Sequence, residues 1–150
     1  MKELRVTPIK NGTVIDHINP GLALKVLHVL KHPEEASSAV SVAMNVKSKM
    51  GKKDIVKIEN KELDKKEVNK ISLIAPKATI NIIRNYEVVK KSRVQLPDEI
   101  IDIVRCSNPT CISNSNEPVD TRFIVACKDP LLIKCYYCER ETEDIAERII

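Results

Sequence analysis

The sequence is poor in aromatic residues: its 150 residues include no tryptophan, one phenylalanine and three tyrosines. Apolar residues still make up 43% of the chain and charged residues 31%, which is the balance of a folded protein rather than a disordered one. A hydrophobic core must therefore be built from valine, isoleucine and leucine, and these residues favour β-sheet with some helix. The length is sufficient for one ordinary domain or for two small ones.

Long apolar segments are also absent. No run approaches the ~18 residues that a membrane-spanning helix needs, and the start, MKELRVTPIKNG, lacks the apolar segment of a secretory signal. We therefore expect a cytoplasmic protein that does not associate with membranes. Because that compartment keeps thiols reduced, the five cysteines are better explained by metal binding or by chemistry than by disulfides.

Several motifs of catalysis are missing. The sequence has no P-loop and no GxGxxG, which argues against ATP hydrolysis and Rossmann-type dinucleotide binding. Asp16 and His17 could form half of a catalytic pair, but no serine or cysteine nucleophile motif accompanies them. A solvated strand end is the simpler interpretation of these two residues. We expect a protein that is not itself an enzyme.

Apolar and polar residues follow strand-like and helix-like patterns in turn along the first two thirds of the chain. The predicted order is β-α-β-β-α-β, with an extra short strand before the first helix. This is the ferredoxin-like pattern of the α+β class, an antiparallel sheet with both helices on one face. Strands are predicted over residues 4–9, 13–18, 39–46 and 55–60, and over residues 78–89 with a bend near Arg84 and Asn85.

Two helices are predicted between these strands. In the first, Asn19 is expected to cap the N-terminus and Pro20 to occupy the first helical position, where a missing N–H has no consequence. In the second, Asp64 and Glu67 stand three residues apart, which is the spacing of a capping box.

The composition changes after a basic segment, KKSRVQLPDE, that breaks at Pro97. All five cysteines fall beyond it, between Cys106 and Cys138. We therefore predict two domains, residues 1–96 and residues 97–150, the second a small β domain that binds zinc.

The zinc prediction depends on cysteine spacing. Cys106 and Cys111 form one close pair and Cys135 and Cys138 another, with 23 residues between the pairs. Two such turns can build a tetrahedral four-thiolate site with no open position, which is structural rather than catalytic. A redox CxxC is the main alternative, although it would leave the first pair unused. Cys127 stands on an apolar strand and is interpreted as a core thiol.

Basic residues gather at the predicted hairpin and strand ends. Such runs are usually solvated, but ammonium groups that converge from two strands could also hold a triphosphate. The net charge of +4 and the pI near 8.8 permit an alternative function, a zinc-ribbon protein that binds nucleic acid. Against it, the aromatic surface of an RNA-binding sheet is missing, so we expect no nucleic-acid partner. The basic cluster comprises Lys52, Lys53, Lys57, Lys90, Lys91 and Arg93.

Four stretches together resemble the regulatory chain of aspartate carbamoyltransferase: GTVIDHI (12–18), MGKKDIVKIEN (50–60), APKATINIIRNYEVVKKSR (75–93) and the layout of the two cysteine pairs. The resemblance implies a non-catalytic regulatory subunit of pyrimidine biosynthesis. Its N-terminal domain would bind the allosteric effectors CTP and ATP and would pair with a second regulatory chain. Its C-terminal domain, with one structural zinc ion, would contact the catalytic chain.

The resemblance also implies roles for individual residues. Asp16 and Lys57 correspond to residues that hold the ribose, and His17 and Lys91 to residues that contact the phosphates. The zinc ligands correspond to the two cysteine pairs. Glu117 and Tyr137 correspond to positions on the surface that faces the catalytic chain. The positions around the base are Ile9, Asn81, Ile83, Tyr86 and Val88.

Overall fold

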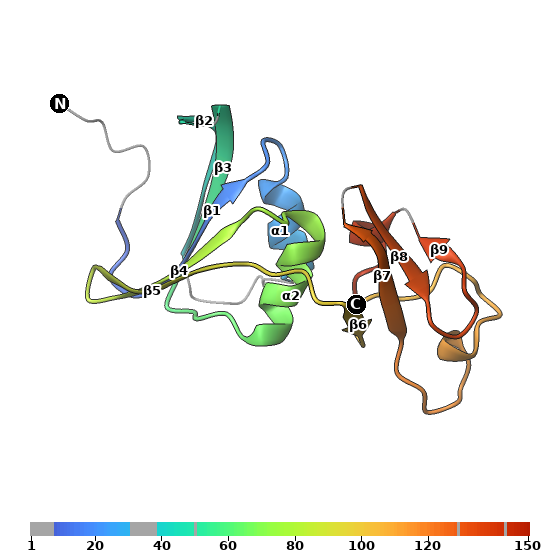
Figure 1. Cartoon of the computed structure of the whole chain (residues 1–150). Coiled ribbons are helices and arrows are strands. Elements are labelled where there is room, and N and C mark those ends of the chain that lie inside the picture. Colours follow the sequence, from blue (N-terminus) through green and yellow to red (C-terminus); the bar gives the residue numbers. More distant parts are fainter. Residues whose placement is uncertain (1–7, 31–38, 50, 129, 143) are drawn as a thin grey trace. The chain divides into compact units, whose positions relative to one another are not determined.

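The computed structural model describes residues 8–30, 39–49, 51–128, 130–142 and 144–150 (Figure 1). The chain divides into two compact units, Met1–Gln95 and Leu96–Ile150. Both units contain strands and helices, so the chain has the α+β class expected from its sequence. None of the helices in the described ranges is long and apolar enough to cross a membrane.

The first unit is built around one antiparallel sheet, in which the strand order is β2-β3-β1-β4-β5. The elements from β1 to β4 follow the predicted ferredoxin-like order, and β5 extends the sheet as a hairpin with β4. The strand predicted over residues 4–9 lies outside the described residues, except for its last two, which are not in a strand. The elements are β1 (Gly12–Ile18), α1 (Ala23–Val29), β2 (Val40–Ser48), β3 (Gly51–Glu59), α2 (Lys65–Ile74), β4 (Thr79–Arg84) and β5 (Glu87–Arg93).

The core of this unit lies between the two helices and one face of the sheet. Ile15, Val56 and Ile80 contribute from the strands, and each is at most 3% exposed. Val26 of α1 and Ile71 of α2 are fully buried against them. Burial of one such side chain stabilises a fold by ~1.5–3 kcal/mol, so an aliphatic cluster can organise the unit without aromatic residues. The other face of the sheet carries neither helix.

The hairpin between β4 and β5 turns at two residues, close to the bend predicted from the sequence. Asn85 and Tyr86 have φ angles of 52° and 65°, and Arg84 pairs with Glu87 across them. Two consecutive residues with positive φ form a type I′ turn, whose twist matches that of the strands. The backbone N–H of Tyr86 donates to the carbonyl oxygen of Lys10 over 2.9 Å, which ties the turn to the segment before β1.

The two helices begin in different ways. In α2 the predicted capping box is confirmed: Asp64 accepts from the Glu67 amide, and the Glu67 carboxylate accepts from the Asp64 amide. In α1 the predicted cap at Asn19 and the predicted first helical position at Pro20 are both wrong, because the helix begins at Ala23. The carbonyl oxygen of Asn19 instead accepts from the Leu22 amide and closes a turn before the helix.

The second unit is a small β domain that contains the four paired cysteines, as predicted. Its four-stranded antiparallel sheet has the order β6-β7-β8-β9. Phe123 and Ile133 are fully buried and Ile100 is 1% exposed, so these three form the centre of a modest core. The elements are β6 (Glu99–Ile101), the short 3₁₀ helix η1 (Ile112–Asn114), β7 (Arg122–Lys128), β8 (Leu131–Cys135), β9 (Glu141–Thr142) and α3 (Ile145–Arg148).

Candidate functional site

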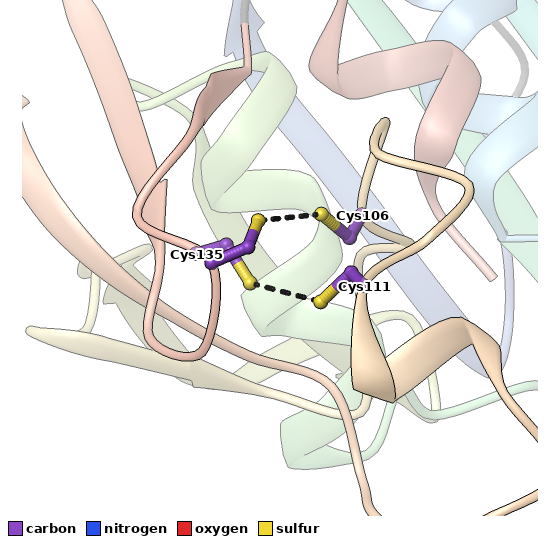
Figure 2. Close-up of side chains that lie close together, drawn as sticks. Cys106, Cys111 and Cys135 are labelled. Atoms are coloured by element: carbon purple, nitrogen blue, oxygen red, sulfur yellow. Dashed lines mark hydrogen bonds between the residues drawn. The ribbon is translucent and has the colours of Figure 1, made fainter.

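Four cysteines converge in the second unit. Cys106 and Cys111 lie on the loop between β6 and η1, and they face Cys135 at the end of β8 (Figure 2). Cys138 follows on the next turn. The Sγ atoms of Cys106 and Cys138 are 3.5 Å apart, those of Cys111 and Cys135 are 3.7 Å apart, and all four lie within 4.8 Å of one another.

These distances fit a shared metal ion. A disulfide would bring two sulfur atoms to ~2.05 Å, so the observed pairs are not disulfides. Four thiolates at ~2.3 Å from one tetrahedral centre have sulfur atoms separated by ~3.8 Å, close to the two short separations seen here. Because four protein ligands fill a tetrahedral ion, such a site has a structural role.

Side chains and amides of the same loop hold the first cysteine pair in place. The Asn108 amide donates to Cys106 Sγ over 3.4 Å. The side-chain amide of Asn114 donates to the carbonyl oxygens of Cys106 and Asn108, at 3.0 and 2.7 Å. In the second pair, the Glu139 amide donates to the Cys135 carbonyl oxygen and closes the turn. The sulfur positions are therefore set by backbone hydrogen bonds and by the side-chain amide of Asn114.

The electrostatics of the cluster favour a bound cation. Burial raises the pKa of Cys106 to about 12 and also raises the pKa of Cys135. Burial acts in the same direction on Cys138, but hydrogen bonds from the Arg140 amide and the Cys106 thiol bring its pKa down to about 7. The thiols thus compete for ionisation within one small volume, and a divalent cation at their centre would remove that competition. Cys127 lies on β7 and is not part of the cluster.

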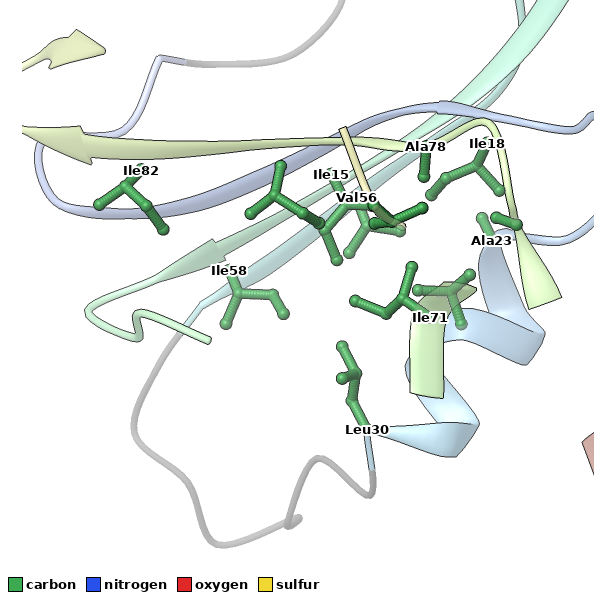
Figure 3. Close-up of a cluster of buried hydrophobic side chains, with 13 residues drawn as sticks. Ile15, Ile18, Ala23, Leu30, Val56, Ile58, Ile71, Ala78 and Ile82 are labelled. Atoms are coloured by element: carbon green, nitrogen blue, oxygen red, sulfur yellow. The ribbon is translucent and has the colours of Figure 1, made fainter. Parts of the chain in front are cut away.

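In the first unit, predicted nucleotide-site residues lie on the helix-free face of the sheet. Ile15 points into the core (Figure 3), so its neighbour Val14 points to the opposite face because strand side chains alternate. The register places Lys57 and Asn81 on either side of Val14, and Lys91 beside Asn81. Lys57, Asn81 and Lys91 therefore lie in one row across strands β3, β1, β4 and β5.

The predicted base-contacting residues continue this face toward the hairpin turn. Ile83 pairs with Val88 and lies two residues after Asn81 on β4, which is the next position on the same face. Tyr86 sits in the turn and is 67% exposed, whereas Ile9 beside it in the preceding segment is 5% exposed. The hydrogen bond between Tyr86 and Lys10 brings these two segments together.

Asp16 and His17 lie at a bulge near the end of β1. His17 has a φ of 57°, and its amide donates to Asp16 Oδ1 over 2.6 Å. The imidazole Nδ1 lies 3.1 Å from Thr79 Oγ1, which orients the ring. Lys53 Nζ is 3.0 Å from Asp16 Oδ1. Such bulges re-aim side chains. The imidazole Nδ1 of His17 also lies 4.0 Å from Asp16 Oδ2, so the two predicted residues stay side by side, with Asp16 between His17 and Lys53.

The surroundings of Lys57 perturb its ionisation. Partial burial lowers the pKa of Lys57, and the negative charge of Asp16 opposes that effect. A lysine held in this way lies in a less hydrated environment than an ordinary surface lysine, which strengthens its interaction with a ligand anion or hydroxyl.

A pocket of about 660 Å³ opens where β1 and β5 end and β3 and β4 begin. Five of its lining residues are basic, and none of the described residues that line it is an aspartate or a glutamate. A cavity with this lining attracts a compact polyanion, such as a polyphosphate. The five are His17, Lys52, Lys77, Lys91 and Arg93.

The structure therefore groups the predicted residues unevenly. His17 and Lys91 share the basic pocket, and Lys52 and Arg93 of the basic cluster line it too. Lys90 lines a different cavity, beside Glu62 and Arg84. Lys77 was not predicted as a site residue; it follows a proline and joins the pocket only because β4 starts there. Thr79 was not predicted either, because its contact with His17 links positions 62 residues apart.

The two predicted interface residues lie on the surface of the second unit. Tyr137 is 37% exposed, and its hydroxyl donates to the Asp120 carbonyl oxygen over 2.9 Å. Its ring meets that of Tyr136 edge-on, with centroids 5.3 Å apart. Glu117 is exposed on the loop after η1. Both side chains are available to a partner, and their role at an interface stays a prediction.

Comparison with known proteins gives two family matches. Residues 4–95 match the family described as aspartate carbamoyltransferase regulatory chain, allosteric domain. Residues 98–147 match the family described as the metal binding domain of the same regulatory chain. The gap between the two matches coincides with the division into two units after Gln95.

Individual relatives match over nearly the whole chain. The aspartate carbamoyltransferase regulatory chain of Methanothrix thermoacetophila is 55% identical over 151 residues, which cover 99% of this chain and 98% of the relative. That of Methanothermobacter thermautotrophicus is 57% identical over 142 residues, covering 94% and 90%. That of Thermococcus sibiricus is 55% identical over 145 residues, covering 96% and 95%.

Proposed function

Because this chain belongs to the family of aspartate carbamoyltransferase regulatory chains, we propose that it is a non-catalytic subunit that binds CTP and ATP and controls the catalytic chains. The observation that carries the proposal is the basic pocket at the end of the sheet, contiguous with the row of Lys57, Asn81 and Lys91. A triphosphate supplies the polyanion that the pocket suits, and a nucleoside supplies polar edges for the row.

The arrangement along the sheet supports one orientation of the nucleotide. The base lies near Ile83 and the Asn85-Tyr86 turn, where backbone groups and the exposed Tyr86 ring can contact it. The ribose lies between Lys57 and Asp16, whose carboxylate can accept from its hydroxyls. The phosphates reach the pocket, where the charges from several strands surround them. Base, ribose and phosphates thus follow one another in the order in which these residues lie along the strands.

The second unit supplies the link to the partner. We infer that the four cysteines hold one zinc ion, which suits four thiolates and introduces no redox chemistry of its own. Cys106, Cys111, Cys135 and Cys138 would hold this ion between their two loops, and the surface with Glu117 and Tyr137 would then contact the catalytic chain. Regulatory chains pair through their first units, and the assembly works in the cytoplasm.

Control by such a subunit follows from linkage. An effector shifts the equilibrium between two states of the assembly only by its difference in affinity for them. Couplings of this kind are typically ~1–3 kcal/mol and are reciprocal, so ligands of the catalytic chain should change the affinity of the regulatory chain for CTP.

Nucleotide binding is tested by alanine substitution at the row and the pocket. Lys91→Ala and Lys57→Ala each remove a cation that contacts the ligand, and a hydrogen bond to a charged group is worth ~1.5–3 kcal/mol. We expect CTP affinity, measured by titration calorimetry on the full chain, to fall about 10- to 100-fold in each variant.

Lys90→Ala is the matched control, since Lys90 is the neighbour of Lys91 on β5 but lines a different cavity. It should leave CTP affinity within about twofold, a difference of ~0.4 kcal/mol. Unchanged affinity in both test variants would contradict the site, and an equal loss in all three would show only a general effect of positive charge.

A further inference from the structure

One buried carboxylate of the first unit is used by neither the core nor the proposed ligand contacts. Asp54 of β3 is fully buried, and its two oxygens accept from three backbone amides. Oδ2 accepts from the amides of Gly21 and Ala23, at 2.8 and 3.1 Å. Oδ1 accepts from the amide of Asn45, at 2.9 Å. Removing a charge from water is unfavourable unless hydrogen bonds replace the lost hydration, so these three bonds hold the carboxylate in a single place.

The first two bonds replace the missing cap of α1. Leu22 precedes the helix and makes no capping bond with its side chain. Asp54 satisfies the free amides there from another strand, 31 residues from Ala23 in the sequence. The loop between β1 and α1 is thereby fixed to β3. That loop includes Asn19 and Pro20, which line the basic pocket.

The third bond joins Asp54 to β2, one of the two edge strands of the sheet. Pairing between β2 and β3 is interrupted between Ala43 and Val46, and Asn45 within this bulge has a φ of 59°. Its amide points to Asp54 instead of taking part in a regular ladder. The same carboxylate therefore holds a wall of the pocket and an irregularity in the edge strand.

The residues beside Asp54 serve the same region. Lys52 lines the basic pocket, and Lys53 pairs with Asp16 on the helix-free face. Three consecutive residues of β3 thus contribute a charge to the pocket, an anchor for Asp16 and a support for the pocket wall.

We propose that Asp54 is a positioning residue that fixes the wall of the basic pocket and joins it to the bulge of β2. A polyphosphate bound in the pocket would then also stabilise the bulge at the edge of the sheet. This inference rests on the proposed nucleotide function for its natural ligand, but the pocket can also be tested with inorganic tripolyphosphate alone. Asp54 itself touches neither ligand.

The first experiment compares two helix-capping carboxylates in the full chain. Asp54→Asn removes the negative charge that accepts hydrogen bonds from the backbone amides at the pocket wall. Asp64→Asn is its matched control, because Asp64 caps α2 and does not line the pocket. Affinities for CTP, CMP and tripolyphosphate are measured by calorimetry, with folding checked by circular dichroism.

We expect Asp54→Asn to weaken CTP and tripolyphosphate binding at least fivefold and CMP binding less than twofold, because the wall serves the outer phosphates. Asp64→Asn should change none of the three affinities by more than twofold. Unchanged tripolyphosphate affinity in folded Asp54→Asn would overturn the inference, and so would an equal loss for CTP and CMP. Wild-type binding of tripolyphosphate but not of CTP would refute the nucleotide function and leave the pocket inference standing.

A second experiment needs no variant and covers the case in which Asp54→Asn does not fold. Amide hydrogen exchange of the wild-type chain is followed by NMR with and without tripolyphosphate. The amides of Gly21, Ala23 and Asn45 should all exchange at least threefold more slowly with the ligand bound. Slower exchange at Gly21 and Ala23 with no change at Asn45 would show that the signal stops at the pocket, and no change at any of the three would overturn the positioning role.

Discussion

The two units of this chain differ in what stabilises each of them internally. In the first, Met1–Gln95, thirteen buried aliphatic side chains of the described residues pack between a sheet and two helices. The second, Leu96–Ile150, has a smaller core and gathers four thiols around one point. A unit of this size buries too little apolar surface to be stable through its core alone, and a structural metal held by the four thiols would supply the missing stability. Removal of the metal should therefore unfold the second unit and leave the first unit folded.

Metal removal is the largest expected effect. Metal binding to zinc-finger peptides contributes ~10–16 kcal/mol, which is most of what holds such small folds together. Treatment with a strong chelator should therefore abolish protection of the amides in β7 and β8 while the amides of β1 and β4 stay protected. Hydrogen exchange with mass spectrometry reports both units in one sample.

Cysteine variants sharpen this result. Cys106→Ser should release the metal and unfold the second unit, whereas Cys127→Ser should retain one metal ion per chain, because Cys127 lies outside the cluster. Metal content is measured by atomic emission. A second unit that stays ordered after complete metal loss would show that its core alone suffices.

A cavity in the core of the first unit should cause the next largest loss of stability, and this loss should be confined to the first unit. Ile71 is fully buried under the sheet, and Ile71→Ala is expected to destabilise the first unit by ~2–5 kcal/mol. Metal content should be unchanged. The loss is measured as the change in the free energy of exchange of β1 amides.

Leu24→Ala is the control for that cavity, because Leu24 lies on α1 but is 62% exposed. Its effect should stay within ~0.5 kcal/mol. Loss of metal in Ile71→Ala would mean that the two units do not fold independently.

The smallest expected effect concerns a single helix cap. Asp64→Ala removes the capping box of α2, and loss of such a cap costs ~1 kcal/mol. The first unit should unfold at a slightly lower urea concentration, and the second should be unaffected. Asp64→Ser, which can still accept from the Glu67 amide, should recover most of the loss. If it recovers none, the charge and not the hydrogen bond is what stabilises this helix.

The caps of the two helices also show how far sequence patterns reach. The cap of α2 was predictable because donor and acceptor stand three residues apart, so local chain geometry decides their contact. The cap of α1 was not, because Asp54 meets Ala23 only after β3 has paired with β1. Nothing in the letters around Asp54 distinguishes a buried carboxylate from a surface one.

The candidate sites divide along the same line. Two close cysteine pairs predicted the metal centre, since few other arrangements explain them, and the sequence needed the fold only to bring the pairs together. For the basic pocket, the sequence showed only separate basic residues, which could be either solvated surface charges or a triphosphate site. Antiparallel pairing placed the ends of four strands together, added Lys77 and left Lys90 outside.

By itself, the sequence determined the aliphatic character of the core, the order of strands and helices in the first unit, and the two close cysteine pairs, because each depends on composition or on neighbours along the chain. Tertiary structure alone decided which cations face one pocket, how the bulge at His17 orients its ring, and where the carboxylate of Asp54 is buried. Those outcomes depend on strand register and on contacts between distant residues, which bring groups together that no short-range pattern relates.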